Sequence, residues 1–112
     1  MFSLTRAGRK SFVDWVNRAD DDFVGGVPPD PLRTRVRFLG LLDATSRNAF
    51  LRKARSSVER HLEAVGEDCE RTMRERGLRN LVARGAFATM ESRHRWLYEV
   101  EKELRNTSRK TK

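Results

Sequence analysis

The run from Asp68 to Leu104 constrains the fold of this chain most, because it contains no proline and is rich in strong helix formers. Its apolar and small residues recur in steps of three and four, which places them on one stripe of an α-helix. They are Met73, Leu78, Leu81, Val82, Gly85, Ala86, Thr89, Met90, Trp96, Leu97, Val100 and Leu104. An unbroken helix over this run would be roughly 55 Å long at about 1.5 Å per residue. A chain of 112 residues cannot cover such a stripe, so we predict that a second copy lies along it.

Two glycines, Gly77 and Gly85, lie inside this run. Each costs about 1 kcal/mol relative to alanine in a helix interior. A glycine here can break the run into two helices, or it can let a neighbouring helix approach closely. Because strong helix formers flank both positions, we expect a continuous or gently bent helix, with a break at Gly77 or Gly85 as the alternative.

Composition indicates a thin, elongated helical protein, since 38% of the residues are hydrophobic and 36% are charged. The one cysteine, Cys69, excludes an internal disulfide framework and fits a reducing compartment. Nothing resembles a signal peptide, and no apolar run approaches the roughly 18 residues of a membrane span. We therefore expect a cytoplasmic protein without a membrane partner. The formal net charge of +8 favours an anionic partner.

Caps and breakers predict four helices. Thr5 is placed to cap a helix from Arg6 to Arg18. A loop rich in glycine and proline then leads to Leu32. A short helix is expected over residues 32–42. Asp43 then caps a long helix, for which Gly66 is the predicted end.

Asp68 caps the final helix in this interpretation, so the two long helices should be antiparallel neighbours. The predicted fold is all-α: an elongated hairpin of two long antiparallel helices with two shorter helices before it, dimerising through the long helices. We assign residues 1–4 to a remnant strand or a disordered end, residues 5–105 to a helical dimerisation domain, and residues 106–112 to a disordered basic tail.

The segment Phe2-Ser-Leu-Thr-Arg-Ala-Gly-Arg9, followed by Trp15-Val16, resembles a junction in the PadR-like and AphA-like transcriptional regulators. In that family it ends the β-wing of a winged helix-turn-helix and leads into the helical domain. Leu41-Leu42-Asp43 is similar to the end of the family's short helix. Arg84-Gly85 with the later Trp96-Leu97 resembles its second long helix.

The resemblance implies the C-terminal helical domain of these regulators, which dimerises and sometimes senses an effector. The winged helix that reads DNA precedes the matching part in the family, and the resemblance implies that this sequence starts inside the wing. We therefore expect a dimerisation or effector-sensing module without its own sequence-specific DNA binding. The alternative is a small basic protein that binds nucleic acid weakly and nonspecifically through exposed arginines. These arginines are Arg71, Arg74, Arg76, Arg79 and Arg84.

Catalysis is not expected, because the sequence shows no constellation of nucleophile, base and charge stabiliser. His61 and His94 fall on different predicted helices, and neither has a partner at metal-ligand spacing. His94 stands between two arginines, which is typical of a solvated helix face. No catalytic residue, metal or cofactor is assigned.

The predicted sites are therefore surfaces for partners. The expected homodimer interface consists of Leu81, Gly85, Trp96, Leu97, Val100 and Leu104. Trp15 and Trp96 are the candidate contacts for a small apolar or aromatic effector, because a tryptophan can stack on a planar ligand between helices. Simple core packing is the alternative role for both rings.

Overall fold

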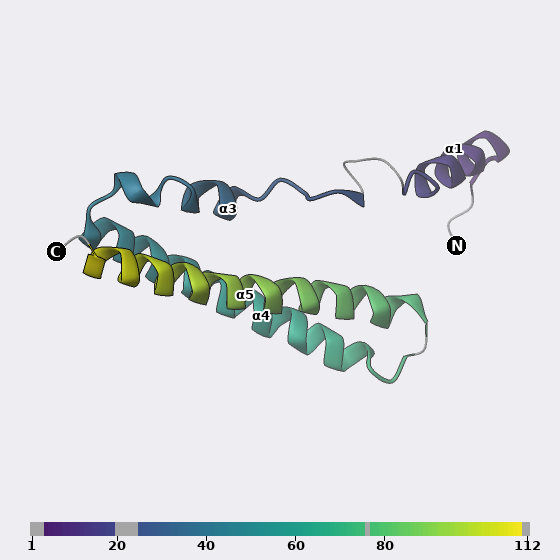
Figure 1. The fold of residues 1–112 in the computed structure, drawn as a ribbon. Helices are drawn as coiled ribbons and strands as arrows, with labels where there is room; N and C mark the ends of the chain where they lie inside the picture. Colours follow the sequence, from purple (N-terminus) through teal and green to yellow (C-terminus); the bar gives the residue numbers. More distant parts are fainter. Residues whose placement is uncertain (1–3, 20–24, 76, 111–112) are drawn as a thin grey trace. The chain divides into compact units, whose positions relative to one another are not determined.

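The computed structural model describes residues 4–19, 25–75 and 77–110 (Figure 1). All regular structure in these ranges is helical, which confirms an all-α fold with two long and two shorter helices. The elements are α1 (Arg6–Val16), α3 (Pro31–Val36), the 3₁₀ turn η1 (Leu39–Leu41), α4 (Ala44–Thr72) and α5 (Leu78–Lys110). The chain divides into two compact units, Met1–Pro31 and Leu32–Lys112, where the sequence predicted one domain over residues 5–105. No helix in the described ranges is both long and apolar enough to cross a bilayer.

Helix α1 belongs to the first unit and begins at the predicted cap. The hydroxyl of Thr5 accepts a hydrogen bond from the Gly8 N–H at 3.0 Å, which satisfies one of the free donors of the first turn. The helix ends at Val16, two residues before the predicted end. The rings of Phe12 and Trp15 lie 6.1 Å apart between centroids, at an angle of 32°. Most of the segment 1–4 expected as a remnant strand lies outside the described residues.

Helix α4 also begins at the predicted residue. An Asp43 carboxylate oxygen accepts the Ser46 N–H at 2.7 Å, and this hydrogen bond lowers the pKa of the carboxyl. The positive charge of Arg47 adds a smaller lowering effect. The predicted end at Gly66 is wrong, because α4 continues through Gly66 and Asp68 to Thr72.

The break between the long helices falls at Gly77, which was the alternative to a continuous helix. Gly77 has φ of +113°, a backbone conformation that residues with a Cβ rarely adopt. The chain therefore turns at Gly77, although the apolar stripe of the sequence continues through this position. Helix α5 then passes through Gly85 without a break and continues beyond Leu104 to Lys110. The tail expected to be disordered from residue 106 is thus helical as far as residue 110.

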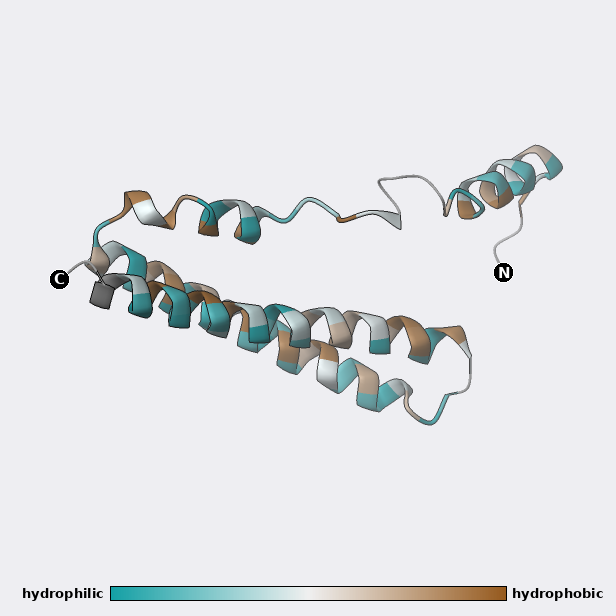
Figure 2. Cartoon of the chain, viewed as in Figure 1, coloured by the Kyte–Doolittle hydropathy of each residue, from teal (hydrophilic) through white to brown (hydrophobic). Residues whose placement is uncertain are grey.

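Helices α4 and α5 pack side by side as an antiparallel hairpin (Figures 1 and 2). The buried positions of α4 include Leu51, Val58 and Thr72, and those of α5 include Ala83 and Leu97. Each set recurs at multiples of seven residues, the repeat of a helix that keeps one seam against its neighbour. The loop end is tied by a hydrogen bond from Asn80 Nδ2 to Thr72 Oγ1 at 3.2 Å.

The segment of α3 and η1 covers the other end of the hairpin. The expected single helix over residues 32–42 is interrupted after Val36, and its second part forms η1. Leu39 of η1 is 2% exposed, and with Val36 it lines a hollow shared with Val100 and Leu104 of α5. The N-terminal part of α3 covers the middle of the hairpin, because Leu32 lines a second hollow with Val58 of α4.

Candidate functional site

The apolar stripe of α5 divides into a covered face and a bare face. The covered face includes Ala83 and Leu97, which are buried, and it packs on α4. Leu78, Leu81 and Val82 point elsewhere and are 78%, 55% and 73% exposed. Met73, in the connection before α5, is also exposed. We call Met73, Leu78, Leu81, Val82 and Gly85 the bare face. Figure 2 shows hydrophobic residues, coloured brown, at the start of α5.

The bare face is bare because the covering segment does not reach it. On α5, the hollows under α3 and η1 are lined by residues from Met90 to Leu104. Leu78 lies twelve residues before Met90, which is about 18 Å along a helix. The half of the stripe next to the loop thus lacks a partner within Leu32–Lys112, in the ranges that the structure describes.

Two features of the bare face suit close approach by another helix. A methyl group on Gly85 would meet no atom within 4 Å, so the backbone is open to a neighbour at this point. One turn further, the Thr89 hydroxyl donates to the Gly85 carbonyl at 3.0 Å. This bond satisfies the hydroxyl within the helix, so a partner would not need to supply an acceptor for it.

The six residues predicted for the dimer interface fall into different environments. Leu81 and Gly85 lie on the bare face, and Trp96 is half-buried. Leu97 is 2% exposed and belongs to the core of the hairpin itself. Val100 and Leu104 line the hollow beneath η1. The contact of all six with a second copy stays a prediction, and Leu81 with Gly85 is the part that the chain leaves accessible.

The predicted effector residues, Trp15 and Trp96, belong to the two units that are described separately, so their shared contact stays a prediction. Trp15 is 69% exposed. The described ranges contain an apolar hollow of about 310 Å³ that neither tryptophan lines. Leu32, Val58 and Met90 supply its apolar wall. Sequence reasoning missed this hollow because it exists only where α3 lies across the hairpin.

The histidines have partners that the sequence did not indicate. His94 Nε2 lies 3.6 Å from an oxygen of Glu59, so this side chain faces α4 and not a fully solvated surface as predicted. His61 Nδ1 lies 2.7 Å from the Ser57 carbonyl, one turn earlier on α4. Among the described residues, no three His, Cys, Asp or Glu side chains gather closely enough to hold a metal ion.

The arginines of the alternative hypothesis lie around the loop end of the hairpin. Arg71 pairs with Asp68 at 2.8 Å, and Arg79 lies 3.6 Å from Glu75. Arg76 is outside the described residues. Arg74 and Arg84 are exposed. Local carboxylates thus offset part of this positive surface.

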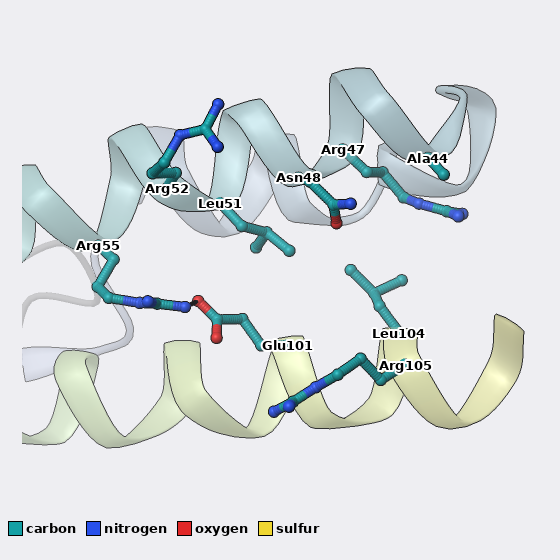
Figure 3. Close-up of a pocket in the computed structure, with 9 residues that line it drawn as sticks. All are labelled: Ala44, Arg47, Asn48, Leu51, Arg52, Arg55, Glu101, Leu104 and Arg105. Carbon is teal, nitrogen blue, oxygen red and sulfur yellow. Dashed lines mark hydrogen bonds and ion pairs between the residues drawn. The ribbon is translucent and has the colours of Figure 1, made fainter. Parts of the chain in front are cut away.

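A second basic cluster, which the sequence analysis did not single out, lies at the opposite end of the hairpin (Figure 3). It surrounds a hollow of about 540 Å³ between the start of α4 and the last turns of α5. Arg55 of α4 donates there to the carboxylate of Glu101 of α5, and this hydrogen bond raises the pKa of the guanidinium. The sequence could not indicate this cluster, because Arg55 and Glu101 are 46 positions apart and meet only through the register of α4 against α5.

Comparison of the chain with protein-family models, with curated proteins and with solved structures gave no match in any of the three. The resemblance to the PadR-like regulators therefore depends on the motifs quoted from the sequence. The helical hairpin and its bare face carry the functional argument instead.

Proposed function

We propose that this protein is a homodimerising helical module, of the kind that the resemblance to the C-terminal domain of PadR-like regulators implies. The observation that carries the proposal is the bare face of α5, where Leu78 and Val82 are about three-quarters exposed beside the open backbone of Gly85. Soluble monomers rarely expose contiguous apolar patches larger than roughly a few hundred Å², and larger patches mark interaction surfaces.

The small core of the chain favours a second copy as the occupant. Five apolar residues are buried in the described ranges: Leu39, Leu51, Val58, Ala83 and Leu97. This is little for 112 residues, because stability depends on the apolar surface removed from water. A second hairpin, packed through the same face about a two-fold axis, would extend the core into a four-helix bundle. In such an isologous contact the same surface of each copy meets the other, so no other protein is needed to cover the bare face.

A pair of matched substitutions tests the interface. Leu81→Asp introduces a carboxylate on the bare face, whereas Tyr98→Asp introduces one at another exposed apolar position of α5. Both positions are exposed in the single chain, so neither carboxylate disturbs the hairpin core. We expect Leu81→Asp to weaken self-association about tenfold or more, which is about 1.4 kcal/mol. Tyr98→Asp should leave it unchanged, as measured by sedimentation velocity.

Equal effects of the two substitutions, or no effect of Leu81→Asp, would contradict the interface. Leu97→Asp is unsuitable for this purpose because Leu97 is buried inside the hairpin. A carboxylate there would unfold the monomer whether or not a dimer exists.

Nonspecific nucleic-acid binding is the second candidate function, and the exposed Arg74 and Arg84 with the net charge of +8 favour it. Binding through phosphates alone is indifferent to sequence and weakens steeply as salt rises. We expect a duplex and its scrambled competitor to compete equally in fluorescence anisotropy titrations. Nanomolar preference for one duplex at physiological salt would contradict nonspecific binding.

A further inference from the structure

The hollow at the open end of the hairpin concentrates positive charge. Four arginines line it: Arg47, Arg52 and Arg55 from α4, and Arg105 from α5. One carboxylate, Glu101, lines it with them and is paired with Arg55. No carboxylate in the described ranges lies within ion-pair distance of Arg52 or Arg105. Figure 3 shows the guanidinium of Arg52 pointing away from α5, which leaves Arg47 of α4 and Arg105 of α5 as the unpaired cations that make the lining complementary to an anion.

The position of Arg47 on α4 opposes the helix's own electrostatics. The N-terminus of a helix carries a partial positive charge, and acidic side chains are stabilising there. Helix α4 has no acidic residue in its first turn, and Arg47 is the fourth residue of the helix. The Asp43 cap offsets part of the charge of Arg47. Arg47 is therefore a local electrostatic cost that a bound anion would reduce.

The remaining lining gives the site an apolar side and a neutral polar group. Figure 3 shows Leu51 and Leu104 pointing toward one another across the space between α4 and α5. The Asn48 amide lies beside Leu51, and the side chain of Arg105 runs along α5 toward Glu101. A ligand with an anionic head and a short apolar body matches this combination of side chains.

We propose that this hollow, which we call the arginine hollow, binds a small organic phosphate through Arg47 and Arg105. A dianionic head is favoured over a carboxylate because two guanidinium groups, those of Arg47 and Arg105, remain after Arg55 is paired with Glu101. Arginine forks match the oxygens of a phosphoryl group with two parallel hydrogen bonds. The apolar body of the ligand would contact Leu51 and Leu104. The site is independent of the bare face, which lies at the loop end of the hairpin.

Isothermal titration calorimetry with monobutyl phosphate and with inorganic phosphate tests the proposal. The titrations use the full chain at about pH 8, where a phosphate monoester with a second pKa near 6 is a dianion. We expect saturable binding of one monobutyl phosphate per chain. Inorganic phosphate should bind several-fold more weakly, because it has no apolar body. Absence of saturable binding of monobutyl phosphate would overturn the proposal.

Charge-matched variants separate the site from general positive charge. Arg47→Gln with Arg105→Gln removes one arginine from each helix at the hollow. Arg60→Gln with Arg84→Gln removes one from each helix on exposed surfaces outside it. The first pair should weaken monobutyl phosphate binding about tenfold or more, and the second should leave it within about twofold. Equal losses would overturn the proposal.

Glu101→Gln gives a second readout that does not depend on removing arginines. It abolishes the carboxylate that competes for Arg55, so monobutyl phosphate should bind more tightly than to the parent chain. Weaker binding to Glu101→Gln would contradict the assigned charges. If duplex DNA, but not monobutyl phosphate, loses affinity when Arg47 and Arg105 are replaced, the hollow is part of a nucleic-acid surface and the proposal is overturned.

Discussion

Gly66 of α4 lies directly against the ring of Phe87 of α5. A methyl group on residue 66 would stand 3.4 Å from Cε2 of Phe87, which is the near limit of ordinary contact. Gly66 is inside α4, so it does not end the helix as a glycine after a helix often does. The ring therefore leaves room for little more than a methyl group at this level.

Enlarging residue 66 should therefore separate the helices. We expect Gly66→Val to destabilise the chain by about 1–3 kcal/mol through overpacking against Phe87. Gly66→Ala should stabilise the chain by up to about 1 kcal/mol, because the helix gains propensity and the added methyl group makes an ordinary contact with the ring. Urea unfolding followed by circular dichroism measures both. Ala64→Val, on an exposed position of the same helix, is the control. A Gly66→Val chain as stable as this control would show that the ring does not pack there.

The turn at Gly77 should require glycine because of its backbone conformation and not because of a close neighbour. A Cβ at residue 77 would meet nothing within 4 Å, so the cost of Gly77→Ala arises from φ of +113°. We expect a loss of about 1–2 kcal/mol in the free energy of unfolding. Gly40 likewise has no neighbour within 4 Å, and no positive φ. Gly40→Ala should change the stability much less. Equal effects of the two substitutions in urea unfolding would argue against the turn.

The Asp43 cap predicts how stability depends on acidity. Because the pKa of this carboxyl is lowered in the folded chain from its ordinary 3.8, its stabilising contribution is present above that value. The contribution is lost as the pH falls through the lowered pKa. Asn is about as good a cap as Asp but does not titrate. The melting temperatures of the parent and of Asp43→Asn should therefore converge or cross below about pH 4. A constant difference down to the lowest pH would exclude Asp43 as the titrating group.

Gly85→Ala should separate the stability of the hairpin from the stability of the dimer. The substitution adds a methyl group in open space inside α5, so the helix should gain about 1 kcal/mol in propensity. The same methyl group would obstruct close approach of a second helix, so self-association should weaken. Thermal melting at low concentration and sedimentation at high concentration measure the two effects. If both properties increase together, Gly85 does not lie at a close helix contact.

The sequence predicted the parts of the fold that depend on local chemistry. Thr5 and Asp43 are caps because their side-chain oxygens reach the backbone three residues ahead, a contact that needs no tertiary structure. The helical period of the long stripe is likewise local. The all-α hairpin with two short helices before it could thus be predicted.

The wrong predictions concern positions where packing decided between two local possibilities. Gly66 and Gly77 are both compatible with a helix end, and the ring of Phe87 against the first and the positive φ of the second distinguish them. The periodic stripe could not show that Leu97 packs inside the hairpin while Leu81 stays exposed, because both satisfy the same period. The arginine hollow depends on the register of α4 against α5, which the sequence alone does not contain.

The mass of the protein in solution tests the central proposal most directly. Sedimentation equilibrium at micromolar concentrations should give a mass of two 13.0 kDa chains. Dilution should shift the parent chain toward the monomer, and Leu81→Asp should make that shift at a higher concentration. A parent chain that sediments as a single 13.0 kDa species throughout the micromolar range would contradict the account.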